Sequence, residues 1–260
     1  VVILKRSTSN VWRIKDLLSK VTVFNIDEID LKIILEQEKP EVIIHTACNY
    51  GRDNNNILDI INTNLIFGIQ LIEEGVKNGV KTFVNTGSLL AKNLNEYSLS
   101  KGQFEEWLKL YSKKIQIINL RIEHMFGPND DIRKFFPWII NEILNNKGDI
   151  KLTPGTQKRD FIHVYNVVEA IALVLNKRKT LTNYNEFDVG TNNFTSVKDV
   201  ILKIIQFLDE SEKNNALRRL KFGEISYREK DVMIPRLNNS KLIELGWIPF
   251  DNLDELIKDY

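Results

Sequence analysis

The sequence predicts an α/β fold: a doubly wound parallel sheet covered by helices, joined to a smaller α+β lobe. Two observations carry this prediction. Short runs rich in Val and Ile alternate with amphipathic stretches over the first half of the chain. Several strand runs, such as VIIH and IQIINL, are apolar at almost every position. Strands that alternate with helices are typical of parallel sheets, and strands buried on both faces carry apolar residues nearly throughout.

The expected elements follow from these patterns. In the first half, strands are expected at residues 1–4, 21–24, 41–45, 81–85 and 115–120, and helices at 11–20, 28–38, 56–78 and 97–113. After Gly127–Pro128 the elements become shorter. There, helices are expected at 133–146, 165–177 and 196–208, strands at 149–152, 161–164, 185–189 and 220–222, and two short helices at the end.

The composition excludes several classes of function. With a net charge of +1, the chain has no general affinity for nucleic acid or for an acidic membrane surface. No apolar run approaches the roughly 18 residues that cross a bilayer. The single cysteine, Cys48, excludes an internal disulfide, and three scattered histidines offer no metal site. These features predict a cytoplasmic protein without a metal.

Tyr97 and Lys101 lie four residues apart where a helix is expected to begin, so they share one helical face. An ammonium beside a phenol favours phenolate and brings its pKa toward the working range of an acid catalyst. By chance, about 0.6 such pairs would occur in this chain, so the spacing alone is weak. Thr86 and Ser88 strengthen the prediction, because they follow a strand at the edge where parallel sheets bind ligands.

The wider sequence resembles the extended short-chain dehydrogenase/reductases, the NAD-dependent epimerase/dehydratase group that acts on nucleotide sugars. Five segments carry the resemblance: VIIHTA at 42–47, NTNLIFG at 62–68, LRIEHMFGP at 120–128, RDFIHV at 159–164 and LGWIP at 245–249. NTGSLLAK, FFPWII and YNEFDVGT resemble a subgroup of 4-ketoreductases that act on CDP-4-keto-3,6-dideoxyhexoses in O-antigen synthesis. Gly87–Ser88 replaces the Asp-Glu pair that dehydratases carry after the threonine.

The resemblance implies a Rossmann-like fold and a role for each matching residue. It makes Ser88, Tyr97 and Lys101 the catalytic residues. The cofactor contacts that it implies are Lys5, Arg6, Ser7, Asp27, His45, Thr46, Ala47, Asn64, Thr86, Tyr97 and Lys101. The nucleotide-sugar contacts are Thr86, Ser88, His124, Lys134, Phe135, Arg159 and Arg228. The side chains of His45 and His163 lie within strand motifs, where a structural role is the stronger expectation.

The cofactor-binding domain is expected at residues 1–123 with 164–195, and the substrate lobe at 124–163 with 196–260. The first strand is followed by Lys5–Arg6–Ser7. Cations at this position suit the 2′-phosphate of NADP(H), whereas an acidic residue would select NAD(H). The sequence therefore favours NADP(H) and a reductase.

The family's fold begins with a strand and a glycine-rich turn for the cofactor pyrophosphate, and this sequence contains neither. About 25–30 residues are therefore expected to be missing before Val1, and this chain is expected to bind its cofactor weakly or not at all. Three readings stay open: a 4-ketoreductase, a 4-epimerase with bound NAD, and an inactive remnant that binds nucleotide sugar. Relatives dimerise through helices matching 56–78 and 97–113, so a homodimer is expected of the full-length protein.

Overall fold

The structure is a computed structural model that describes residues 1–52, 56–145 and 147–257. The chain divides into two compact units. The first comprises residues 1–87, 95–119 and 180–186, and the second comprises 88–94, 120–179 and 187–260. These divisions differ from the expected domains mainly in placing the helix after residue 163 with the second unit. The functional division into a cofactor domain and a substrate lobe stays a prediction.

The strands of the first unit form two sheets. In one, β1 (Val2–Lys5) pairs with β2 (Thr22–Asn25) in parallel. In the other, the strand order is β3 (Val42–His45), β4 (Thr82–Ser88), β5 (Gln116–Ile122) and β9 (Tyr184–Val189). β3 and β4 are parallel. Among the described residues, β1 pairs only with β2 and β3 only with β4, so the expected single sheet is divided between them.

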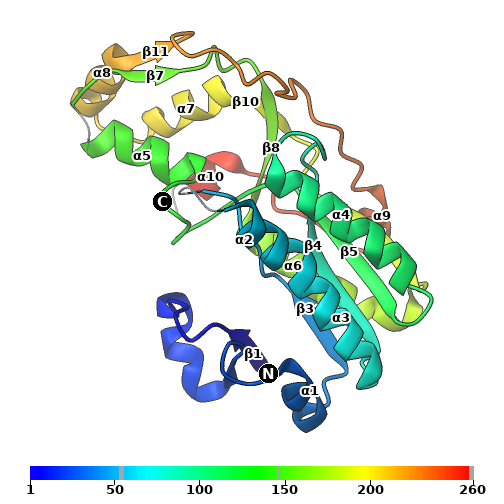
Figure 1. Cartoon of the computed structure of the whole chain (residues 1–260). Coiled ribbons are helices and arrows are strands. Elements are labelled where there is room, and N and C mark those ends of the chain that lie inside the picture. Colours follow the sequence, from blue (N-terminus) through cyan, green and yellow to red (C-terminus); the bar gives the residue numbers. More distant parts are fainter. Residues whose placement is uncertain (53–55, 146, 258–260) are drawn as a thin grey trace. The chain divides into compact units, whose positions relative to one another are not determined.

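The helices of the first unit follow the expected ranges with two corrections. Residues Trp12–Lys20 form a 3-10 helix, η1, rather than the expected α-helix. The expected helix at 56–78 is three consecutive segments: α2 (Ile57–Ile61), a π-helical turn η2 (Asn62–Ile66) and α3 (Phe67–Lys77). The other two helices are α1 (Leu31–Glu38) and α4 (Glu96–Tyr111), which lies beside α3 in Figure 1.

An apolar cluster packs these helices against the sheet. Its buried members come from α1, α3, α4 and the strands between them: Leu35, Ile43, Leu71, Ile72, Val80, Phe83, Phe104, Leu108, Ile115 and Ile117. Gly68 allows α3 to approach α4 closely, because a Cβ built there would lie 2.6 Å from Cζ of Phe104. α4 is thus held against the turn η2. The predicted site residues Tyr97 and Lys101 lie at the start of α4.

The second unit is built from short strands and helices. β8 (Lys158–His163) pairs in parallel with β6 (His124–Phe126) and antiparallel with β10 (Phe194–Ser196). β7 (Ile150–Leu152) pairs in parallel with β11 (Leu220–Phe222). The helices are α5 (Phe135–Asn145), α6 (Val164–Lys177), η3 (Arg178–Thr180), α7 (Val197–Gln206), α8 (Glu210–Arg219), α9 (Ser240–Leu245) and α10 (Leu253–Ile257). Figure 1 shows α7 and α8 beside the β7–β11 ribbon.

The core of the second unit is formed mainly by α5, α7 and the strands beside them. Its centre includes Phe126, Phe136, Ile139, Val200 and Ile204. The C-terminal segment is tied to α6 through Asn166, whose side chain both accepts from and donates to the backbone of Phe250 at 2.8 Å. The indole of Trp247, in the LGWIP segment, donates to the Asn166 carbonyl at 3.3 Å. The LGWIP motif therefore joins the C-terminal segment to α6.

Candidate active site

The predicted acid and its neighbouring cation lie in the first turns of α4. The side chain of Asn95 accepts a hydrogen bond from the N–H of Ser98, and the Ser98 hydroxyl accepts one from the N–H of Asn95. This capping box fixes where the helix begins. Tyr97 and Lys101 follow one turn apart, so the structure places both on one side of α4. Tyr97 is half-buried and Lys101 is only 3% exposed.

Lys101 is unusual because its positive charge lies inside the protein. No hydrogen bond to its ammonium is found in the part of the chain that the structure describes. Burial lowers the pKa of Lys101, and the nearby Cys48 and Glu105 side chains partly oppose this by favouring the ammonium. A buried ammonium without hydrogen-bond acceptors is costly. A bound ligand with hydroxyl groups, such as a ribose, would supply acceptors that the described residues do not.

His45 lies at the end of β3 in a cage of aromatic rings. Its ring is 2% exposed, and it lies 5.9 Å from the rings of Phe67 and Phe83 and 5.5 Å from that of Phe104. Burial, together with the nearby charge of Lys101, lowers the pKa of His45 to about 3. The imidazole is therefore neutral at physiological pH. Its position supports the expected structural role of the side chain, and a cofactor contact by this residue stays a prediction.

Asn64 links the loop after β3 to the start of α4. Its side-chain oxygen accepts from the N–H of Asn49 at 2.6 Å, and its amide donates to the Asn49 carbonyl at 2.8 Å. The same amide donates to the hydroxyl of Ser100 at 3.0 Å, and that hydroxyl donates to the Tyr97 carbonyl at 2.8 Å. Asn64 is fully buried within the π-helical turn η2, a type of distortion that is frequent at functional sites.

Thr86 and Ser88 are among the last three residues of β4. They were expected just beyond the strand, but the strand continues to Ser88. The Thr86 hydroxyl donates to the His45 carbonyl at 3.1 Å. Ser88 belongs to the second unit, where its hydroxyl accepts from the N–H of Leu90 at 3.2 Å. The catalytic role of Ser88 stays a prediction.

The end of β1 and the two residues after it bring cations close to the carboxylate of Asp27, which follows β2. Both the hydroxyl and the N–H of Ser7 donate to Asp27, at 2.6 and 2.8 Å, and these hydrogen bonds lower the pKa of the carboxyl. Arg6 is exposed and donates to the Thr63 hydroxyl at 3.3 Å, while the Lys5 ammonium donates to the Arg6 carbonyl at 3.1 Å. The donors of Ser7 are thus already engaged by a negative charge.

Other predicted cofactor contacts lie next to a pair of residues that the sequence did not single out. Thr46 and Ala47 follow β3 directly, and Tyr50 and Arg52 continue the same loop. The Tyr50 ring stacks on that of Tyr97, with ring centroids 4.9 Å apart and planes at 28°. Aromatic residues in loops follow no periodic pattern, so no sequence signal marked Tyr50.

Three predicted substrate contacts lie in the second unit. His124 begins β6 and its Nδ1 lies 2.8 Å from the Glu123 carboxylate. Lys134 pairs with Asp130 at 2.9 Å. Phe135 begins α5, as expected, but its ring stacks on Phe161 at 5.7 Å and packs against the core.

Arg159 and Arg228 are connected through one loop. The Arg159 guanidinium pairs with Asp231 and donates to the Val232 carbonyl. The N–H of Asp231 donates to the carbonyl of Arg228 at 3.0 Å. Arg228 itself is exposed. Arg159 therefore anchors the segment that carries Arg228.

Asp160 follows Arg159 and is fully buried. Its carboxylate accepts from the Thr191 hydroxyl at 3.0 Å and from the N–H of Asn192 at 2.6 Å. Burial raises the pKa of Asp160 to about 6, although these hydrogen bonds favour the charged form. Asp160 is thus a titratable group inside the RDFIHV segment.

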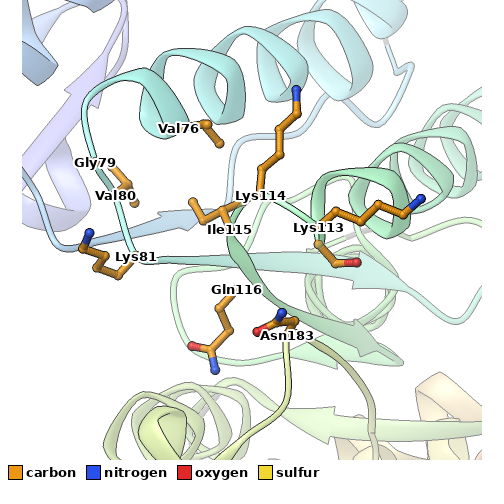
Figure 2. A pocket seen from close by; sticks show the side chains of 10 residues that line it. Val76, Gly79, Val80, Lys81, Lys113, Lys114, Ile115, Gln116 and Asn183 are labelled. Atoms are coloured by element: carbon orange, nitrogen blue, oxygen red, sulfur yellow. The ribbon is translucent and has the colours of Figure 1, made fainter.

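A hollow of about 330 Å³ in the first unit contains none of the predicted site residues. It lies before β4 and β5 begin, at the opposite ends of these strands from Thr86. Figure 2 shows that the side chains of Lys81, Lys113 and Lys114 at its rim point in different directions and do not converge on one point. The hollow is therefore no counterpart of the predicted site.

In residues 1–52, 56–145 and 147–257, no group of three or more His, Cys, Asp or Glu side chains is placed to hold a metal ion. Within the same ranges, no helix is both long and apolar enough to cross a membrane.

Comparison with known proteins identifies the family. A model of the NAD dependent epimerase/dehydratase family matches residues 1–190. The chain belongs to this family. A CDP-abequose synthase of Salmonella typhimurium is 33% identical over 228 residues, covering 83% of this chain and 75% of the relative. One of Salmonella muenchen is 30% identical over 243 residues, covering 90% and 80%. The resemblance predicted from the sequence motifs is confirmed.

Solved structures of the epimerase/dehydratase family share the fold. A UDP-glucose 4-epimerase of Thermotoga maritima, solved with UDP-glucose, has a TM-score of 0.80 at 21% identity and covers all of this chain and 88% of its own. One of Thermus thermophilus, solved with NAD, has a TM-score of 0.77 at 19% identity and covers 99% and 88%. The predicted Rossmann-like α/β class is confirmed.

Proposed function

We propose that this protein reduces the 4-keto group of a nucleotide-linked deoxysugar of the CDP-4-keto-3,6-dideoxyhexose type, with NADPH as the reductant, in O-antigen synthesis. The observation that carries the proposal is the buried ammonium of Lys101 one turn after the half-buried phenol of Tyr97. The CDP-abequose synthases, at 30–33% identity, support the substrate class.

In this proposal, NADPH would supply the hydride. Tyr97 donates a proton to the oxygen that becomes the new hydroxyl, while Ser88 holds that oxygen by a hydrogen bond. Lys101 stabilises the phenolate that remains on Tyr97, because a cation beside a phenol favours its charged form. Its ammonium would also hold the ribose of the cofactor.

The preference for NADPH rests on Lys5, the last residue of β1, and on Arg6, which follows it. Their charges suit a phosphate, whereas the Asp27 carboxylate beside Ser7 suits ribose hydroxyls. In this proposal, the preference for NADPH over NADH therefore depends on the charge of Arg6. Replacing Arg6 with Ala should weaken NADPH binding more than NADH binding, and an equal loss for both would contradict the preference.

The substrate diphosphate would lie against Arg159 and Arg228, whose guanidinium groups suit bidentate contacts to phosphate. His124 and Lys134 add polar contacts in this proposal, and Phe135 adds an apolar one. Thr86 would lie beside the sugar. Each assignment predicts a higher KM for the nucleotide sugar when the side chain is truncated.

The function is tested by incubating the protein with a CDP-4-keto-3,6-dideoxyhexose and NADPH and following absorbance at the nicotinamide band. One NADPH should be oxidised for each sugar reduced. Conversion of a nucleotide sugar to its 4-epimer without net NADPH loss would favour the epimerase instead. Tyr97→Phe should remove most of kcat, by about 100-fold or more, with substrate binding nearly unchanged.

Cofactor affinity tests the third reading. Titration by fluorescence measures NADPH binding by this chain, and the proposed reduction requires that NADPH binds. Binding of NADPH together with turnover would contradict the third reading. Binding of nucleotide sugar without any turnover would instead favour the inactive remnant.

A homodimer through α2, α3 and α4 is also proposed. Leu99, Trp107 and Leu110 recur at helical spacing on α4 and are between 40% and 60% exposed. Ile57 and Leu58 on α2 and Ile66 on η2 are exposed apolar residues as well. Leu110→Glu should shift the mass measured by light scattering from dimer to monomer. Leu217→Glu, at an exposed site on α8, is the control that should leave it unchanged.

A further inference from the structure

The loop after β3 presents an aromatic ring to the proposed acid. Tyr50 stacks on Tyr97 with ring centroids 4.9 Å apart. The Arg52 guanidinium lies over the Tyr50 ring at 5.3 Å, and its Nη1 atom is buried without a hydrogen-bond partner among the described residues. The contact with the ring therefore accounts for part of the placement of Arg52. The side chains of Arg52, Tyr50 and Tyr97 thus contact one another in that order.

The backbone of this loop is fixed on both sides of Tyr50. Asn49 exchanges two hydrogen bonds with the buried side chain of Asn64. Gly51 adopts a φ of +68°, and its N–H donates to the Asn49 side chain at 2.9 Å. A Cβ at Gly51 would lie 2.8 Å from Cδ1 of Ile60. The loop cannot shift freely, so the Tyr50 ring presents a fixed surface.

Tyr97, by contrast, is half-buried at the open first turns of α4. Its ring turns about two side-chain bonds, and proton transfer requires its hydroxyl within hydrogen-bond reach of the substrate oxygen. A small misplacement of a reacting group can reduce a rate by about 100-fold. A rigid neighbour that restricts this rotation would therefore raise the fraction of enzyme ready to react.

We infer that Tyr50, held by Arg52, is a positioning residue that fixes the ring of Tyr97 for proton transfer. The inference rests on the proposed function for its kinetic consequence, but the stacking itself can be measured without activity. The part played by Tyr50 is the flat face of its ring, so its hydroxyl is not required. This distinguishes it from a residue that binds substrate through that hydroxyl.

The first test uses NMR of protein labelled at its seven tyrosines, with Tyr97→Phe to assign the signals of Tyr97. Stacking shifts the ring protons of Tyr97 upfield. Tyr50→Phe should keep this shift, and Tyr50→Leu should remove it. An unchanged Tyr97 signal in Tyr50→Leu would overturn the inference whether or not the protein is a reductase.

The second test measures kcat and KM of the same variants. Tyr50→Leu should lower kcat by about 10-fold to 100-fold with KM for the nucleotide sugar within about twofold. Tyr50→Phe should recover most of kcat, and Arg52→Met should give a smaller loss of the same kind. Equal kcat in Tyr50→Leu and wild type would overturn the positioning role. A loss in KM alone, shared by Tyr50→Phe, would instead show substrate binding by the hydroxyl. If the stacking is seen but no reduction occurs with any CDP-4-ketosugar, the proposed function fails while the stacking stands.

Discussion

The ring of Phe104 on α4 lies directly over Gly68 on α3, in the space that any larger residue's side chain would occupy. A Cβ at Gly68 would lie 2.6 Å from Cζ of that ring, and Phe104 is fully buried. The contact sets the distance between the two helices at the level of the proposed site. It also explains why the central-helix motif carries glycine here.

Gly68→Ala should destabilise the protein by about 1–3 kcal/mol, because the added methyl overpacks a rigid aromatic contact. In an open helix the same change would stabilise by up to about 1 kcal/mol. Urea unfolding measures the difference. Gly75→Ala on the same helix is the matched control, since its Cβ would lie 3.1 Å from the tip of Ile43 and at ordinary contact distance, 3.5 Å, from Val80. Equal effects at the two positions would contradict the packing argument.

Lys101→Met should stabilise the protein at neutral pH, on the order of 1 kcal/mol, while abolishing the proposed reduction. Burial lowers the pKa of Lys101, so the unfolded chain binds more protons between that lowered pKa and 10.5. Wild-type stability should therefore rise with pH across this window, and the variant should lack that rise. Thermal unfolding at several pH values measures both.

The control for this prediction is Lys109→Met, because Lys109 lies on the same helix but is exposed. It should leave both the stability and its pH dependence nearly unchanged. A Lys101→Met variant less stable than wild type at neutral pH would show that the buried ammonium is well solvated or paired in the folded protein.

Asp160→Asn should flatten the pH dependence of stability between about 4 and 6. Burial raises the pKa of Asp160 from 3.8 to about 6, so the folded state binds more protons than the unfolded state in this window. The contribution of this group to stability is therefore full below pH 4 and is lost as the pH rises through 6. Urea unfolding from pH 4 to 7 measures it, with Asp16→Asn as the exposed control. An unchanged slope in Asp160→Asn would contradict the raised pKa.

Arg159→Lys should raise KM for the nucleotide sugar about 10-fold while leaving kcat nearly unchanged, because lysine cannot reproduce a bidentate contact. The structure shows Arg159 already bound to Asp231 and the Val232 carbonyl, so a second variant separates the roles. Asp231→Asn breaks the ion pair but leaves the guanidinium in place. If Asp231→Asn raises KM as much as Arg159→Lys, Arg159 acts by holding the loop and does not bind diphosphate itself.

The sequence predicted the strands well because their apolar runs are continuous and separated by helical patterns. The strands expected at 41–45 and 115–120 are β3 and β5 with small shifts. β6 and β10 were not among the expected strands; each has only three residues, so an alternating pattern gives little signal there. Helix α8 was missed because it buries only Ala216 and Arg219, so it carries no apolar stripe.

The part of the site that lies on one helix could be predicted from the sequence, and the part that depends on distant segments could not. Tyr97 and Lys101 share a helix, and helical spacing is visible in a sequence. Asn64 belongs to a motif, but its hydrogen bonds to Asn49 and Ser100 depend on how distant segments meet. The stack of Tyr50 on Tyr97 likewise depends on a loop conformation that no spacing rule encodes.

The π-helical turn Asn62–Ile66 also limits how the chain can change in length. A π turn holds one residue more than the α-helix on either side of it. Deleting one residue there would restore regular helix, but each residue accounts for about 100° of helical rotation. Every side chain before the deletion would turn by that angle relative to those after it. Asn64 and Gly68 could then not face Asn49 and Phe104 at the same time. We therefore expect insertions and deletions to be tolerated less in this turn than elsewhere in the two helices.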